Sequence, residues 1–120
     1  MNFDSASLSE QGPRAENEDS IINEEFRAEY LLIGVADGLG GHEGGKTASR
    51  LAIGRLQEAI SKNPETSLAR IATSIHSELR EMQSDNKLRG MATTLSAALI
   101  HQMQLTFVHC GDSRIAVALQ

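Results

Sequence analysis

The order in which helix-like and strand-like patterns of apolar residues follow one another constrains the fold of this chain more than any other feature. Two consecutive segments between residues 48 and 82 carry apolar residues at three- and four-residue spacing, which is typical of amphipathic helices. Asn63-Pro64 separates the two segments, and Thr66 or Ser67 can cap the second helix. Their apolar stripes are Ala48, Leu51, Ala52, Leu56, Ala59 and Ile60, and then Leu68, Ile71, Ala72, Ile75, Leu79 and Met82.

Strand-like segments stand on both sides of this helical pair. Before it, residues 3–9 alternate weakly, "SIINEEF" (20–26) follows, and the aliphatic run "EYLLIGVAD" (29–37) predicts a buried strand that ends at Asp37. After it, "ATTLSAALI", "LTFVHC" and "RIAVALQ" predict three consecutive strands joined by short turns. Because strands and helices are segregated rather than alternating, the sequence predicts an α+β fold.

Composition narrows the class of protein. The chain has 120 residues, enough for one domain, and its 3% of aromatic residues implies a core of Leu, Ile, Val and Ala. A net charge of -5 without a Lys/Arg cluster disfavours nucleic acid and anionic membranes as partners. The single cysteine, Cys110, which we expect in the core, cannot form an internal disulfide. With neither a signal-peptide pattern nor a membrane-length apolar run, the sequence predicts a cytoplasmic protein.

The glycine-rich stretch "GLGGHEGGKT" fits two kinds of chemistry. From Gly40 it matches the P-loop pattern, in which Lys46 and Thr47 would bind phosphate and magnesium. The P-loop fold, however, needs alternating strands and helices, and the preceding strand is expected to end early, at Asp37. Gly44 and Gly45 are also explained by a helix that starts close against a sheet. We therefore interpret the P-loop match as a coincidence.

The second interpretation is a metal site just before this stretch. A carboxylate at the end of a buried strand, such as Asp37, can bridge two divalent cations, and the Gly38 carbonyl can approach one of them. Such hard oxygen ligands suit Mg²⁺ or Mn²⁺. The pair Glu18-Asp19 opens another predicted strand, where neighbouring side chains face opposite ways, so at most one would ligate directly. Taken alone, Glu18-Asp19 and Asp37-Gly38 are each also typical of an ordinary turn.

Four motifs occur together in a fixed order: "GPRAENEDS", "VADGLGGHEGG", "GMATTLSAAL" and "VHCGDSRI". In combination they resemble the PPM-type family of metal-dependent serine/threonine protein phosphatases, especially its bacterial members, from Gly12 to the end of the chain. The resemblance implies part of a four-layer sandwich, in which antiparallel sheets are flanked by helix pairs. It also implies that residues 1–120 are the N-terminal portion of one phosphatase domain, incomplete at the C-terminus and without the family's later aspartates.

The resemblance assigns roles to particular positions. It implies that Arg14 holds the substrate phosphate, where the alternative is an ordinary surface arginine. It also implies that His42 donates a proton to the leaving alkoxide, although packing within the loop or a polar contact is an equal alternative. The implied metal ligands are Glu18, Asp37, the Gly38 carbonyl and, for a third and weaker ion, Asp112, with Asp19 as a supporting acid behind them. For Asp112 the alternative is an ordinary hairpin turn.

The function implied is hydrolysis of phosphoserine and phosphothreonine in a protein substrate by metal-activated water. The intact domain would hold two Mn²⁺ or Mg²⁺ ions, with a third bound more weakly. Because the later aspartates are missing, a second hypothesis is a non-catalytic binding module that kept the fold and lost the site. A P-loop nucleotide-binding protein is the third hypothesis, and the oligomeric state is left open.

Overall fold

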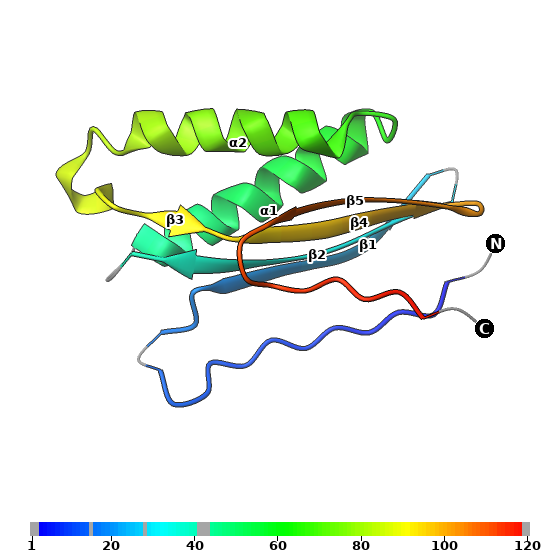
Figure 1. Cartoon of the computed structure of the whole chain (residues 1–120), viewed down its shortest axis with the longest axis horizontal. Helices are drawn as coiled ribbons and strands as arrows, with labels where there is room; N and C mark the ends of the chain where they lie inside the picture. Colours follow the sequence, from blue (N-terminus) through cyan, green and yellow to red (C-terminus); the bar gives the residue numbers. More distant parts are fainter. Residues whose placement is uncertain (1–2, 15, 28, 41–43, 119–120) are drawn as a thin grey trace.

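The protein forms one antiparallel sheet with two helices packed on one of its faces (Figure 1). The computed structural model describes residues 3–14, 16–27, 29–40 and 44–118. The elements are β1 (Asp19–Phe26), β2 (Tyr30–Leu39), α1 (Gly44–Lys62), α2 (Leu68–Met82), the short 3₁₀ helix η1 (Asn86–Leu88), β3 (Ala92–Thr93), β4 (Leu95–His101) and β5 (Gln104–Cys110). The sheet order is β1-β2-β4-β5, and β3 pairs with the end of β2. The predicted α+β class is confirmed.

Both helices lie where the apolar stripes predict them. Ser67, not Thr66, caps α2, because its side chain accepts a hydrogen bond from the Arg70 backbone N–H at 3.3 Å. Pro64 lies in the connection that follows the end of α1 at Lys62. In the part of the chain that the structure describes, no helix combines the length and apolar character needed to cross a membrane.

The core lies between the helices and the sheet. Leu32 of β2 and Leu56 and Ile60 of α1 are completely buried there, and β2 alternates between buried and exposed positions along most of its length. The cluster is built from Leu, Ile and Ala together with one methionine, Met91, and partly buried aromatic side chains lie only at its margin. The prediction of an aliphatic core is therefore confirmed.

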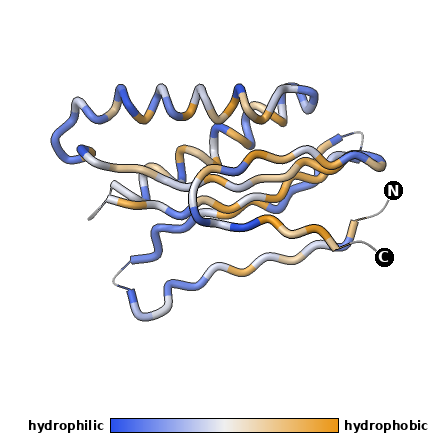
Figure 2. Tube along the Cα trace, viewed as in Figure 1, coloured by the Kyte–Doolittle hydropathy of each residue, from blue (hydrophilic) through white to orange (hydrophobic). Residues whose placement is uncertain are grey.

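The other face of the sheet is covered by the two terminal segments instead of helices. Ile33, Val35 and Phe107 point to this side and keep 38%, 42% and 61% of their surface exposed. The segments near the two termini run beneath the sheet (Figure 1), and the one leading to the C-terminus is mostly hydrophobic (Figure 2). Together with the sheet face they line a groove of about 350 Å³.

Two of the predicted strands do not form. Residues 3–9 and 114–118 are extended but take part in no ladder that the structure describes, while residues 119 and 120 lie outside the described part. Both segments lie across a sheet face rather than along a sheet edge, where backbone hydrogen bonds could pair them. An alternating pattern of apolar and polar residues therefore does not predict whether another strand lies close enough to pair with the segment.

Two finer predictions are also wrong. Strand β2 continues past Asp37 to Leu39, because β3 extends the pairing with Gly38 opposite Thr93 and Leu39 opposite Ala92. Cys110 is exposed rather than part of the core, since it is the last residue of β5, a strand at the sheet edge.

Candidate active site

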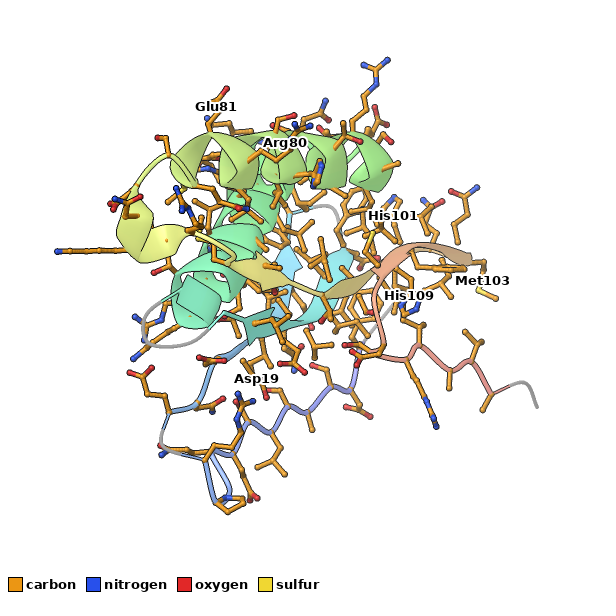
Figure 3. All side chains as sticks on the ribbon, turned by 60° about the vertical axis from the view of Figure 1, so that its left-hand side comes forward. Asp19, Arg80, Glu81, His101, Met103 and His109 are labelled. Atoms are coloured by element: carbon orange, nitrogen blue, oxygen red, sulfur yellow. The ribbon has the colours of Figure 1, made fainter. Side chains whose placement is uncertain are left out.

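The register of the sheet brings two predicted site residues face to face. Asp19, the first residue of β1, lies directly opposite Asp37 of β2, so both carboxylates are on the sheet face away from the helices. Figure 3 shows Asp19 on that side, with Arg80 and Glu81 of α2 on the other. It also shows His101 and Met103 near the opposite end of the sheet, which matches the pairing of His101 with Tyr30 at the start of β2.

The charges around Asp37 are mostly of its own sign. Partial desolvation, a hydrogen bond with Asp19 and the negative charges of Asp19 and Asp112 raise the pKa of the Asp37 carboxyl above its ordinary value. The positive charge of Arg14 acts in the opposite direction on the same pKa. The structure therefore gathers Arg14, Asp19, Asp37 and Asp112, from three of the four motifs, at one end of the sheet.

Glu18 occupies a different environment from its neighbour Asp19. It is buried, with 7% of its surface exposed, and its Oε2 accepts a hydrogen bond from Nη2 of Arg14 at 3.1 Å. Its backbone carbonyl accepts two more, from the Gly38 N–H at 3.1 Å and from Oγ of the fully buried Ser49 at 2.6 Å. These bonds connect the start of β1 both to the end of β2 and to α1.

Glycines permit the start of α1 to pack directly on this end of the sheet. A Cβ on Gly38 would overlap the Gly45 carbonyl oxygen, and a Cβ on Gly45 would lie 2.8 Å from Oε2 of Glu18. The interpretation of Gly45 as a close-approach residue is thus supported. The strand before the glycines is antiparallel to both of its neighbours, whereas the P-loop fold needs a parallel sheet. Because β2 ends at Leu39 and not at Asp37, the early end of the strand no longer counts against a P-loop. The antiparallel sheet is a stronger argument against it.

The predicted site residue His42 lies outside the described residues. Another histidine, His109 of β5, has its Nδ1 2.7 Å from Oγ of Ser96 in β4. Two hydroxyl residues that the sequence did not single out also contact the site: Ser49, described above, and Thr94, whose Oγ1 accepts a hydrogen bond from the Asp37 N–H at 2.9 Å. Ser49 lies outside the four motifs, and Thr94 lies within "GMATTLSAAL", a motif to which the sequence assigned no contact.

The donor chemistry at this end of the sheet fits a hard divalent cation. Carboxylates with like-charged neighbours, together with backbone carbonyls, are ligands that Mg²⁺ and Mn²⁺ accept, and a cation would offset the repulsion at Asp37. The number of donors is small, however. Within residues 3–14, 16–27, 29–40 and 44–118, no group of three or more His, Cys, Asp or Glu side chains is arranged to hold a metal ion. The described residues therefore offer few candidate ligands for a complete coordination shell.

Comparison with known proteins identifies the family. The family model for protein phosphatase 2C matches residues 9–120, so the chain belongs to this family. It is 39% identical over 108 residues to the serine/threonine protein phosphatase PstP of Mycobacterium tuberculosis, an alignment that covers 84% of this chain and 20% of that protein. With the serine/threonine phosphatase stp of Listeria innocua it shares 34% identity, over 84% of this chain and 44% of that protein.

Solved structures agree with this assignment. The chain superposes on the catalytic domain of the serine/threonine protein phosphatase PstP, solved in complex with two manganese ions, with a TM-score of 0.73 and 34% identity. It superposes on the S. agalactiae serine/threonine phosphatase with a TM-score of 0.71 and 32% identity. The two matches cover 91% and 90% of this chain but only 48% and 47% of the solved chains, so the chain spans about half of each.

Proposed function

We propose that this chain supplies the part of a phosphatase active site that binds the phosphate and bridges the metal ions. The reaction is hydrolysis of phosphoserine or phosphothreonine in a protein by metal-activated water. The observation that carries the proposal is the convergence of Arg14, Asp19 and Asp112 on Asp37, because these residues come from motifs far apart in the sequence. The phosphatase activity of the relatives supports the same reaction.

Arg14 is suited to hold the phosphate. Its Nη2 is bonded to Glu18, but 55% of its side chain is exposed, so other donors of the guanidinium fork can bind phosphoryl oxygens. Glu18 thus orients the arginine beside Asp19, Asp37 and Asp112, which together are called the acidic cluster. Arg14 also lies close enough to Asp37 to act on its pKa, so a phosphate held by Arg14 would be near the carboxylate proposed to bind metal.

Residues of the acidic cluster would hold Mn²⁺ or Mg²⁺, two ions in the intact domain and a third, weaker one at Asp112. Asp37 would bridge the ions, and Glu18 would be a ligand of one of them. The Gly38 carbonyl would be a further ligand of one ion, and Asp19 would support these ligands. When bound, such ions lower the pKa of a coordinated water and neutralise phosphoryl oxygens. His42, by its place in the motif, would protonate the leaving alkoxide.

The same proposal covers the setting of the reaction. Residues 1–120 are proposed as the N-terminal portion of one phosphatase domain, because the matched relatives are at least twice as long as the aligned region. The substrate is a phosphorylated protein, and the composition favours a cytoplasmic protein without nucleic acid or membrane partners.

Metal binding and turnover test this function separately. Titration of Mn²⁺ into ¹⁵N-labelled protein should broaden the amide resonances near Asp37 and Asp112, and Asp37→Asn should abolish the effect. Asp19→Asn and Glu18→Gln compare the two acids: the larger loss of Mn²⁺ affinity identifies the direct ligand. Turnover of p-nitrophenyl phosphate by this chain alone should be weak, and strong turnover would show that its metal site is complete. Absence of any Mn²⁺ effect would contradict the proposed site.

A second candidate is a phosphopeptide-binding module without catalysis. It is favoured by the small number of metal donors among the described residues and by the engagement of Glu18 with Arg14. Calorimetry with a phosphoserine peptide, with and without Mn²⁺, separates the two functions. Binding that needs Arg14 but not Mn²⁺ supports the module, whereas Mn²⁺-dependent binding supports the phosphatase.

A further inference from the structure

The ladder beside β2 is interrupted opposite Asp37. Val35 pairs with Ser96 of β4, and Gly38 pairs with Thr93 of β3 in the same register, so Asp37 lies opposite Thr94. Thr94 belongs to neither strand. In a regular antiparallel pair of this kind the two residues would exchange both backbone hydrogen bonds.

At this position a side chain replaces one backbone group. The Thr94 N–H donates to the Asp37 carbonyl at 3.0 Å, as in a regular ladder. The Asp37 N–H, however, donates to Oγ1 of Thr94 at 2.9 Å, while the Thr94 carbonyl accepts a bond from the Thr93 hydroxyl at 2.8 Å. The backbone of Asp37 is therefore held by Thr94 through both of its polar groups.

The same threonine contacts the turn that carries Asp112. Its Oγ1 lies 3.1 Å from Oγ of Ser113, within hydrogen-bond distance. Its methyl group fills the space beside Gly111: a Cβ on Gly111 would lie 2.5 Å from Cγ2 of Thr94. Gly111 also has a φ of 108°, which side chains rarely adopt. Thr94 is thus bonded to Asp37 on one side and packed against both neighbours of Asp112 on the other.

We propose that Thr94 is a positioning residue, which holds Asp37 and the Gly111–Ser113 turn in one arrangement so that their carboxylates face the same site. The inference rests on the proposed function, because it assigns Thr94 to the geometry of the acidic cluster. One hydroxyl serves both sides, since it can accept from Asp37 and donate to Ser113 at the same time. Its loss removes the side-chain hydrogen bonds to both carboxylate-bearing segments without removing a charge, while the bond from the Thr94 N–H to the Asp37 carbonyl remains.

Three variants of the 120-residue chain test this role by NMR. Thr94→Val keeps the shape and removes the hydroxyl, and Thr94→Ser keeps the hydroxyl and removes the methyl. Thr93→Val is the matched control, because the Thr93 hydroxyl donates to the Thr94 carbonyl instead. The measurements are the hydrogen exchange of the Asp37 amide relative to that of Leu32, and the apparent Mn²⁺ affinity from broadening at Asp37 and Asp112.

Thr94→Val should speed exchange at Asp37 about five- to tenfold beyond any change at Leu32, the effect of one lost hydrogen bond, and weaken Mn²⁺ binding by a similar factor. Thr94→Ser should restore both readouts to within about twofold, and Thr93→Val should leave Asp37 unchanged. Unchanged exchange in Thr94→Val, or equal effects of Thr94→Val and Thr93→Val, would overturn the inference. Absence of Mn²⁺ broadening in the unmodified chain would instead overturn the proposed function and, with it, the catalytic meaning of Thr94.

Discussion

Strand β2 passes through two regions of opposite character. Along most of its length, its inward side chains pack with α1 into a core whose residues are apolar, and Leu32 is completely buried there. At its end, Asp37 is exposed among charges of its own sign and is held by hydroxyl and backbone hydrogen bonds. One strand thus joins a region that stabilises the fold to a region where ionised carboxylates oppose it.

The difference indicates how stability and function are separated in this protein. Burial of apolar surface in the core contributes most of the favourable free energy of folding. An unpaired charge placed in this core would be strongly destabilising. The acidic end is unfavourable for the protein without a metal, and its carboxylates stay close because the surrounding glycines and hydroxyls fix their backbones. Substitutions in the core should therefore change mainly the free energy of unfolding, and substitutions at the acidic end should change mainly the response to Mn²⁺.

The largest expected effect on stability is in the core. Leu56→Ala removes a completely buried side chain from α1 and should lower the free energy of unfolding by about 3 kcal/mol, measured by urea denaturation. Leu105→Ala, at a 38% exposed position of β5, should cost about 1 kcal/mol or less. The Mn²⁺ response of folded Leu56→Ala should be unchanged. Equal costs of the two substitutions would contradict the assignment of the core to the helix side.

The next effect is at the contact between the two regions. Gly38→Ala places a Cβ against the Gly45 carbonyl and should lower the free energy of unfolding by about 1–3 kcal/mol and weaken the Mn²⁺ response. The control is Gly54→Ala in α1, where nothing lies within 4 Å of the added Cβ. That substitution should raise the free energy of unfolding by up to about 1 kcal/mol, because alanine favours helix. A neutral Gly38→Ala would mean that α1 does not pack tightly on β2.

At the acidic end, removing a charge should stabilise the protein. Because the folded-state pKa of Asp37 is raised, its ionisation opposes folding, and Asp37→Asn should raise the Tm of the metal-free protein by a few degrees at neutral pH. The difference between the two proteins should vanish below the unfolded-state pKa of about 4 and grow as the pH rises through the folded-state pKa. The Mn²⁺-induced rise in Tm should be lost. A lower Tm for Asp37→Asn would show that attraction to Arg14 outweighs the repulsion.

The smallest effect is expected on the outer surface of the helices. Arg55 of α1 bonds both oxygens of Glu78 in α2, at 2.9 and 2.6 Å, and these bonds and its charge lower the pKa of Glu78. The stabilisation is present above the unfolded-state pKa of Glu78 and is lost as the pH falls through the lowered folded-state pKa. Glu78→Gln should lower the Tm by at most about 2 °C at neutral pH, and less in 1 M salt. A large decrease that salt does not reduce would contradict a purely surface role.

Much of the fold could be predicted from local pattern. The stripes place both helices, Asn63-Pro64 separates them, and Ser67 caps the second, because helix signals depend on residues within a few positions. The strands β1 and β2 were also predicted, apart from the end of β2 at Leu39. Residues 3–9 and 114–118 were predicted wrongly, since an alternating pattern does not reveal whether a backbone partner lies beside it.

The candidate site divides in the same way. The motifs indicate which residues carry the chemistry, and family membership agrees with the phosphatase interpretation. Their separate roles at the metal stay predictions, and the proximity of Asp19 to Asp37 could not be predicted without the register. Ser49 and Thr94 act through single hydroxyls on backbone groups tens of residues away. Ser49 lies outside the four motifs, and the motif "GMATTLSAAL" contains Thr94 without indicating what its hydroxyl contacts.

The sequence alone therefore determined the class of fold, the helices and the acidic and arginine residues, because periodicity, capping and residue chemistry are local properties. Only the tertiary structure decided which residues meet. It placed Arg14, Asp19 and Asp112 around Asp37, packed α1 on Gly38, and set Thr94 between two motifs. The physical reason is that sheet register and helix docking are set by the packing of the whole core. A shift of one residue in β1 or β2 would turn Asp19 or Asp37 to the other face of the sheet.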